Sequence, residues 1–501
     1  MEIMRLTTKA GSGLEKKISL GDLVPFAVFV ILGFLLIVYP FYSVGFLAIA
    51  ALVAFAWLAL GQMRRAGLEA WQVMLLIALS GYTLLNYGFE NLAVHIGGIP
   101  IIFSYLLMYG SVLLAVWSLR QSALRTFREP IVFCLLALLL LTLFHLAVDI
   151  PSYGLWALRD ASMVLDGIAL FLGLFWAMRR NSTMPLLQWL MVIFLLNLVY
   201  GLSFPWSERI QEWSPSSGVF LQVPILGFYH ATYIWLLAGL LFCLFLSVYV
   251  VSWPRWIILC LSLAQLFGLA IHQARSMYVA LGVALVVLLF LRETAKGTKL
   301  LLVLSGAVLG LFLLTSVAGV EMSGRIGPVN LDFFKQHLRS ISGAEDTPGS
   351  SVEGRVDWAD QALQRFHSSP WFGVGFGQPL INWTQEDGTS VRQPHNSSLS
   401  ILARLGAVGF AVWIMFHLCL LKAFFHALRH RHSWSELMSD LILWLFLLYL
   451  TFMIVIHVEP GLEFPTGAIP FYFFVGLSVG LVRSQVATAR EATYRETGDR
   501  F

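Results

Sequence analysis

Three basic or titratable residues carry the chemistry that this sequence suggests. Arg275 lies between two apolar runs, Arg355 lies near the expected start of a polar helix, and His395 precedes another apolar run. A guanidinium group binds phosphate oxygens through paired hydrogen bonds and stays charged. Histidine, with an ordinary pKa of about 6.5, is the natural general base near neutral pH. We therefore expect one site that binds a phosphate group and activates a hydroxyl.

Each of these residues also has a plainer interpretation. Arg275 can anchor the edge of a membrane helix by reaching toward the interface. Arg355 can pair with Glu353 or Asp357, although a cation in the first turn of a helix opposes the helix dipole. A lone histidine before a span is more often an interfacial residue than a catalyst. The functional interpretation therefore requires that the three residues meet.

Further candidates lie in the polar stretch 350–406. Asn396 could orient a neighbouring group or a sugar, and Trp371 could stack on a sugar ring or anchor at the membrane interface. Arg404 is expected to form an internal salt bridge, with an ion path as the alternative. The glycines from Gly373 to Gly377 lack the strand and helix of a dinucleotide loop, so they predict a tight turn.

The elements that must position these residues are membrane helices. The chain has 501 residues, 58% hydrophobic and 12% charged, whereas soluble domains are about 25% charged. The fold class is therefore an all-α polytopic integral membrane protein. About fourteen apolar runs are long enough to cross a bilayer. They lie near 23–39, 44–60, 71–87, 98–118, 131–148, 160–178, 186–203, 229–251, 256–272, 276–291, 299–318, 397–420, 437–457 and 467–483.

The distribution of lysine and arginine predicts the orientation. These residues gather in alternate short loops, which places both termini in the cytoplasm and one large loop outside. That loop is expected to contain short helices near 331–341 and 351–367. The first apolar run is read as a retained span and not as a cleaved signal. The expected parts are a cytoplasmic tail (1–22), a transmembrane bundle (23–318), the outer loop (319–396), C-terminal spans (397–483) and a cytoplasmic tail (484–501).

Metal and redox chemistry are not suggested. The four cysteines all fall within apolar segments, and none has the spacing of metal ligands. No paired-carboxylate motif that would bind a divalent ion is apparent. We therefore expect no metal and no cofactor.

The order of the motifs resembles the O-antigen ligase and O-antigen polymerase superfamily of bacterial membrane glycosyltransferases. The resemblance covers about 270–410. Two departures concern Ala274 and Ser276, where relatives usually have Ser and Gly, and Arg404, where they often have a polar or acidic residue. The matching pieces are Ala274-Arg275-Ser276, Gly354-Arg355 with Trp358, the turn from Ser369 to Gly375, and His395-Asn396 with Leu399, Leu405-Gly406 and Gly409.

This resemblance implies a metal-independent, inverting transfer of a glycan from undecaprenyl pyrophosphate on the periplasmic side of the bacterial inner membrane. Arg275 and Arg355 would hold the pyrophosphate, and His395 would activate or position the acceptor hydroxyl. Asn396, Trp371 and Arg404 would support the site or the acceptor. The acceptor would be a growing glycan (polymerase, slightly preferred), lipid A–core (ligase) or a protein.

The alternative class is a lipid-linked glycan flippase or another polytopic transporter. Such proteins are often built from internal repeats around a central path. No repeat is detected in this sequence, and transport leaves the long outer loop unexplained. The expected partners are the lipid-linked donor, a glycan or lipid A–core acceptor and membrane lipids, and no nucleic acid.

Overall fold

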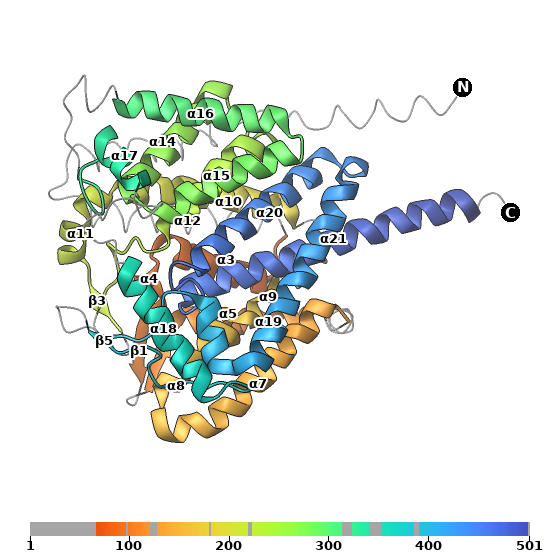
Figure 1. Cartoon of the computed structure of the whole chain (residues 1–501). Coiled ribbons are helices and arrows are strands. Elements are labelled where there is room, and N and C mark those ends of the chain that lie inside the picture. The colour runs from red at the N-terminus through yellow and green to blue at the C-terminus, as the bar shows by residue number, and fades with distance from the viewer. Residues whose placement is uncertain are drawn as a thin grey trace, which may run out of the picture. The chain divides into compact units, whose positions relative to one another are not determined.

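The computed structural model describes residues 67–96, 99–119, 128–179, 182–218, 223–312, 323–339, 352–384 and 390–498 (Figure 1). The chain divides into two units, Met1–Gln62 and Met63–Phe501. The first unit, with the predicted tail 1–22 and the predicted spans 23–39 and 44–60, lies outside the described residues. All contacts below belong to the second unit.

Helices dominate the described residues. In chain order they are α3 (Ala70–Leu84), α4 (Tyr87–Glu90), α5 (Phe103–Leu119), α7 (Pro130–Tyr153), α8 (Leu155–Leu165), α9 (Ala169–Ala177), α10 (Thr183–Leu202), α11 (Ser207–Trp213), α12 (Thr232–Phe245), α13 (Ser247–Val250), α14 (Arg255–His272), α15 (Arg275–Phe290), α16 (Thr294–Phe312), α17 (Leu331–Arg339), α18 (Val352–Ser368), α19 (Ser397–His430), α20 (Glu436–Ile456) and α21 (Pro465–Gly498). Short 3-10 helices are η2 (Asp166–Ile168), η3 (Phe204–Trp206) and η6 (Arg431–Ser433).

The strands are few and short. Antiparallel pairs are formed by β1 (Ala93–Ile96) with β2 (Ile99–Ile102), β3 (Ser216–Ser217) with β4 (Val223–Pro224), and β5 (Trp383–Thr384) with β6 (Ser390–Val391). The β2 strand corrects one prediction, because the expected span 98–118 becomes helical only at Phe103. Three of the four β2 residues are isoleucine, and β-branched side chains favour a strand.

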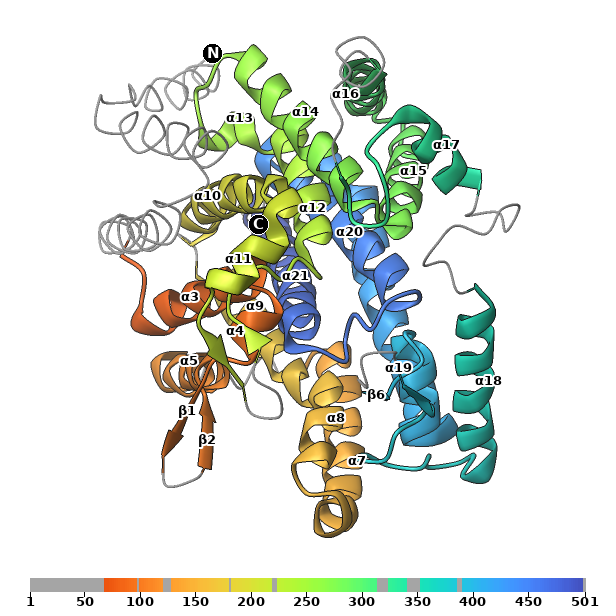
Figure 2. The same ribbon diagram turned by 90° about the vertical axis from the view of Figure 1, so that its left-hand side faces the viewer.

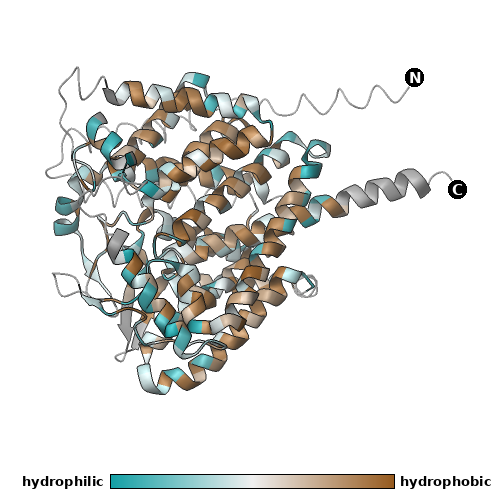
Figure 3. Cartoon of the chain, viewed as in Figure 1, coloured by the Kyte–Doolittle hydropathy of each residue, from teal (hydrophilic) through white to brown (hydrophobic). Residues whose placement is uncertain are grey.

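The apolar helices confirm the all-α polytopic class. Within the described ranges, seven helical segments are long and apolar enough to cross a membrane, and four shorter apolar helices accompany them. The total of about fourteen spans stays a prediction. Figure 3 shows brown, apolar residues along the long helices and teal, polar residues on elements such as α18. The seven segments are Pro130–Tyr153, Leu155–Ala177, Thr183–Leu202, Arg255–His272, Ser397–Ser433, Glu436–Ile456 and Pro465–Ala487.

Glycines bring the central helices into close contact. A side chain at Gly173 of α9 would collide with the carbonyl of Phe473, and one at Gly476 of α21 would collide with the carbonyl of Leu170. Membrane helices associate through such small residues because lipid tails provide no hydrophobic drive for helices to pair. The α9–α21 pair therefore forms a closely packed centre.

The predicted large loop contains the short helices that the sequence indicates. The α17 and α18 helices agree with the expected helices at 331–341 and 351–367. The α18 helix packs against α19 (Figure 2). This packing is anchored by Trp358 of α18, which is buried with Leu380, Ile381 and Ala403. The loop is therefore held on the bundle through an apolar cluster.

Candidate functional site

The junction between α14 and α15 places Arg275. Gln273 adopts the left-handed conformation (φ 51°), and its N–H donates to Leu269 O at 3.1 Å, which ends α14. Ala274 is extended, and α15 begins at Arg275. The tight reversal between two apolar helices therefore puts the arginine at a helix end and not in a span interior.

Arg355, which belongs to the predicted outer loop, lies near Arg275 at the α14–α15 junction. It lies in the first turn of α18, and its side chain is 49% exposed. The charge of Arg355 acts on Arg275, so the two guanidinium groups lie within electrostatic range of each other. Arg355 Nη2 is also 4.0 Å from Glu459 Oε1, between α20 and α21. Two of the three proposed site residues therefore lie within range of each other's charge, and the Glu459 carboxylate lies beside Arg355.

His395 completes this group. Its ring lies 4.9 Å from the ring of Trp358, one turn after Arg355 on α18, and Trp358 lies 5.3 Å from Trp383. Burial, followed by the charges of Arg355 and His230, lowers the pKa of His395 to about 4. The imidazole is therefore neutral at neutral pH and able to accept a proton.

The sequence interpretation missed four residues of this region. Arg325 lies close enough to the Tyr233 hydroxyl to interact with it, and the charges of Glu459 and Arg355 also act on Tyr233. His230, two residues before α12, lies within range of the Arg325 charge. These residues come from separate segments, so no local pattern joins them. The available signal was an arginine between glycines at the start of the outer loop, in Gly324-Arg325-Ile326-Gly327.

The Asn396 side chain forms hydrogen bonds within the protein. Its Oδ1 accepts from Leu399 N at 3.1 Å, which caps α19, and its Nδ2 donates to His457 O at 3.1 Å. Ser397, next in the chain, bonds to Glu463 in the α20–α21 connection. These bonds fix the start of α19, beside His395, to the loop that carries Glu459.

Trp371 lies at the opposite end of α18 from Arg355. The helix between them rises by about 20 Å at 1.5 Å per residue. The Trp371 side chain is 69% exposed. The structure therefore does not bring Trp371 to the arginines, and its position agrees with the interfacial-anchor interpretation.

Arg404 forms an internal salt bridge, as the sequence predicts. It is fully buried, and its Nη2 lies 2.9 Å from Asp160 Oδ2. Arg392 Nη2 approaches the same oxygen at 3.2 Å. Arg404 Nη1 also donates to Gly375 O at 3.1 Å. This residue therefore ties the glycine turn to α8.

The glycine-rich segment is the predicted tight turn. Gly373, Gly375 and Gly377 have positive φ, as does Gly406, where α19 is interrupted. At the interruption, Gly375 N donates to Arg404 O at 3.0 Å and Ala407 N donates to Pro370 O at 2.8 Å. The turn thus replaces hydrogen bonds that the broken helix loses.

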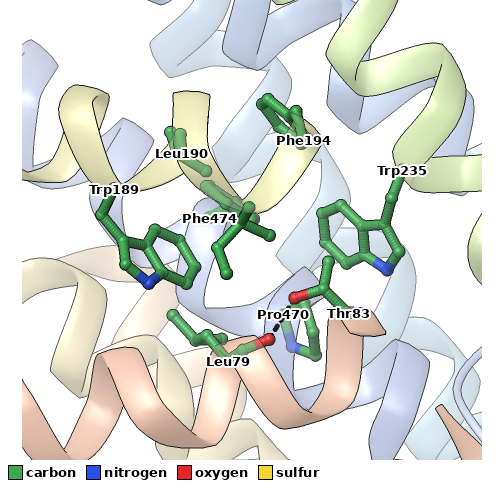
Figure 4. A pocket seen from close by; sticks show the side chains of 9 residues that line it. Leu79, Thr83, Trp189, Leu190, Phe194, Trp235, Pro470 and Phe474 are labelled. Carbon is green, nitrogen blue, oxygen red and sulfur yellow. Dashed lines mark hydrogen bonds between the residues drawn. The ribbon is translucent and has the colours of Figure 1, made fainter. Parts of the chain in front are cut away.

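A separate pocket lies among α3, α10, α12 and α21 (Figure 4). Its lining is apolar apart from Thr83 and the indole nitrogens, and the Thr83 hydroxyl bonds to Leu79 O in its own helix. No charged side chain lines it within the part of the chain described. The pocket therefore offers nothing that would bind a phosphate group. Its larger lining residues are Trp189, Phe194, Trp235, Pro470 and Phe474.

Comparison with known proteins bears directly on this region. Residues 258–414 match the family model described as O-Antigen ligase, and this range holds Arg275, Arg325, Arg355 and His395. The chain is also 25% identical over 297 residues to an O-antigen ligase of Pseudomonas aeruginosa, an alignment that covers 55% of this chain and 64% of that relative. The resemblance to the O-antigen ligase and polymerase superfamily is confirmed by these two matches.

Proposed function

We propose that this protein is a membrane glycosyltransferase of surface polysaccharide assembly, which transfers a glycan from undecaprenyl pyrophosphate to an acceptor. The observation that carries the proposal is the meeting of Arg275 and Arg355 next to His395. Like charges disfavour each other when held together. An anionic ligand between them removes that repulsion, and a pyrophosphate matches the fork geometry of guanidinium groups.

The arginines would act on the leaving group. As the bond between the sugar C1 and the phosphate oxygen breaks, the electron pair and the new charge go to undecaprenyl pyrophosphate. Arg275 and Arg355 would stabilise that charge, the role that a divalent ion has in other glycosyl transfers. The reaction we propose is therefore metal-independent.

His395 would act on the acceptor. The acceptor oxygen forms a bond to C1 from the face opposite the pyrophosphate, which inverts the anomeric centre, and its proton passes to the imidazole. In the ligand-free protein, burial and Arg355 lower the pKa of His395 to about 4. A bound pyrophosphate would offset the arginine charge and raise this pKa toward the range of an effective base.

The acceptor separates the two main candidates. The number of apolar runs slightly favoured a polymerase, whereas the Pseudomonas aeruginosa relative is an O-antigen ligase. On that ground we propose lipid A–core as the acceptor, with a growing glycan second. The proposed location is the bacterial inner membrane, with both termini cytoplasmic and the site facing the periplasm.

A deletion strain tests this function. Its lipopolysaccharide and lipid-linked intermediates would be separated on gels, with and without the gene restored. Bare core with long chains still on undecaprenyl pyrophosphate is the result expected for a ligase. Single repeat units on the core would indicate a polymerase instead. An unchanged pattern, or lipid-linked units accumulating on the cytoplasmic face, would contradict the proposed transfer and, in the second case, favour transport.

A further inference from the structure

The start of the outer loop closes onto the α14–α15 junction through one buried glutamine. Gln273 is 4% exposed. Its Oε1 accepts from Ile326 N at 2.7 Å and Gly327 N at 3.0 Å, and its Nε2 donates to Gly327 O at 2.9 Å and Pro328 O at 3.3 Å. One side chain thus satisfies four backbone groups of the loop. Removing such a partner leaves buried polar groups unpaired.

The backbone of Arg325 is held from both sides. Arg325 N donates to Ile271 O at 3.0 Å, and Gly324 N donates to Gly327 O at 2.9 Å. The ideal position of a Cβ on Gly324 lies 2.5 Å from Gln273 Nε2, so a larger residue there would displace the Gln273 side chain from the loop. Arg325 is therefore placed by the same few residues that place Arg275.

The Arg325 side chain faces the region of the other arginines. Its guanidinium lies within interaction range of the Tyr233 hydroxyl, on which the Arg355 charge also acts. Arg325 itself is exposed, so it can be reached by a ligand. The segments that supply the three arginines thus converge near the start of α12.

We propose that Arg325 is a third cationic ligand of the pyrophosphate and that Gln273 positions it. This inference rests on the proposed function and adds a third arginine to the proposed pyrophosphate site. The chemistry favours a third cation because the pyrophosphate gains one negative charge when its bond to the sugar breaks. A fixed guanidinium that meets this charge stabilises the transition state more than the bound substrate.

The first experiment compares Arg325→Gln and Arg325→Lys in the full-length protein in nanodiscs. The probes are the lipid-linked glycan donor for turnover and undecaprenyl pyrophosphate for product inhibition. Arg325→Gln is expected to lower kcat by about a hundredfold and to weaken inhibition by undecaprenyl pyrophosphate, with the KM for the acceptor unchanged. Arg325→Lys, which keeps a point charge, should recover part of both losses.

A purely structural role for Arg325 would give a different pattern. Loss of the interaction with Tyr233 alone would lower the thermal midpoint of the folded protein and leave inhibition by undecaprenyl pyrophosphate at the wild-type level. That outcome overturns the proposal. If Arg325→Gln fails to fold, Arg325→Lys provides the test. Lysine cannot form the paired hydrogen bonds of a guanidinium group, so wild-type kcat and wild-type inhibition in Arg325→Lys would also contradict a direct contact between Arg325 and the pyrophosphate.

Gln273 is tested through its dependence on Arg325. Gln273→Glu keeps an oxygen that accepts from the loop N–H groups but loses the donor to the carbonyls of Gly327 and Pro328. It should lower kcat in the wild-type background, yet change it by less than about twofold when Arg325 is already glutamine, since residues acting as a unit are not additive. Full additivity would show that Gln273 does not act through Arg325.

A matched control and one reference variant separate this inference from the proposed function. Arg365→Gln changes an arginine about 15 Å along α18 from Arg355, and it should leave turnover unchanged. Arg355→Gln should weaken inhibition by undecaprenyl pyrophosphate. If only Arg355→Gln does so, the third cation is refuted and the function survives. If neither variant does, both proposals fail.

Discussion

Two groups of arginines in this protein differ in burial and in pairing. Arg404 is fully buried and sits 2.9 Å from Asp160. Arg355 is 49% exposed, and its distance to Glu459 is 4.0 Å. A buried charge without a close counter-charge is strongly destabilising, whereas an exposed one costs little. The buried group therefore holds the structure together, and the exposed group remains available to bind an anion.

The same difference separates the two parts of the outer loop. The glycine turn meets α19 through backbone hydrogen bonds and the buried Asp160 cluster, so its polar groups are satisfied by the protein. At the other end of α18, the charge of Arg355 acts on His395 and Arg275. One loop thus combines a rigid attachment at the glycine turn with a proposed reactive site at the Arg355 end of α18. Substitutions at the two ends should therefore affect different properties: activity at the Arg355 end and stability at the glycine turn.

Alanine variants of the proposed site residues Arg275, Arg355 and His395 should have the largest effect on activity. His395→Ala is expected to lower turnover by about a hundredfold to ten-thousandfold, and Arg275→Ala and Arg355→Ala each by about a hundredfold or more. Transfer would be measured by lipopolysaccharide gels and by turnover in nanodiscs. The amount of folded protein in the membrane should stay at the wild-type level.

Lys335→Ala provides the control for these variants. Lys335 lies on α17 in an exposed pair with Asp332 at 3.5 Å, and its removal should leave activity intact. Full activity in all three alanine variants would show that Arg275, Arg355 and His395 do not form the active site.

Substitution in the buried group should act on stability. Asp160→Asn leaves Arg404 buried without its carboxylate, so we expect a loss of about 3–5 kcal/mol in the free energy of unfolding. The readout is the yield of monodisperse protein after heating, measured by size-exclusion chromatography. Unchanged thermal stability together with lost turnover would instead place Asp160 in the reaction.

The pH dependence of stability should reveal the neutral His395. Its folded-state pKa is about 4, below the ordinary value of about 6.5 in the unfolded chain. The unfolded state therefore binds a proton first, so the contribution of His395 to stability is present above pH 6.5 or so and is lost as the pH falls toward 4. His395→Gln should show a smaller drop in thermal midpoint across this window. An equal drop in both proteins would contradict the shifted pKa.

The smallest expected effect concerns Asn396. Asn396→Ala removes the cap of α19 and should lower stability by about 1 kcal/mol, while turnover per folded molecule stays near the wild-type value. Asn396→Asp keeps an oxygen that accepts from Leu399 N and should be more stable than the alanine variant. If Asn396→Ala lowers turnover severely at unchanged stability, Asn396 belongs to the acceptor site and not to the attachment.

Much of this molecule follows from local sequence. The apolar runs predict the helices because burial in lipid requires a continuous apolar surface and internal backbone hydrogen bonding. The α18 helix and the turn at Gly373 to Gly377 were predicted correctly for similarly local reasons. The salt bridge expected of Arg404 followed from the cost of an unpaired charge, whereas its partner Asp160 lies far away in the sequence. The strand at Ile99–Ile102 was missed, because an apolar run alone does not distinguish a strand from a helix.

Residue types that could do the chemistry follow from the sequence, since arginine suits a phosphate group and histidine suits proton transfer from a hydroxyl. Tertiary structure alone decided which of them meet. It placed Arg325 with Arg275 through Gln273, and it left Trp371 at the far end of α18. The physical reason is that proximity between distant segments depends on helix packing and on a few buried hydrogen bonds, and neither leaves a periodic or local pattern in the chain.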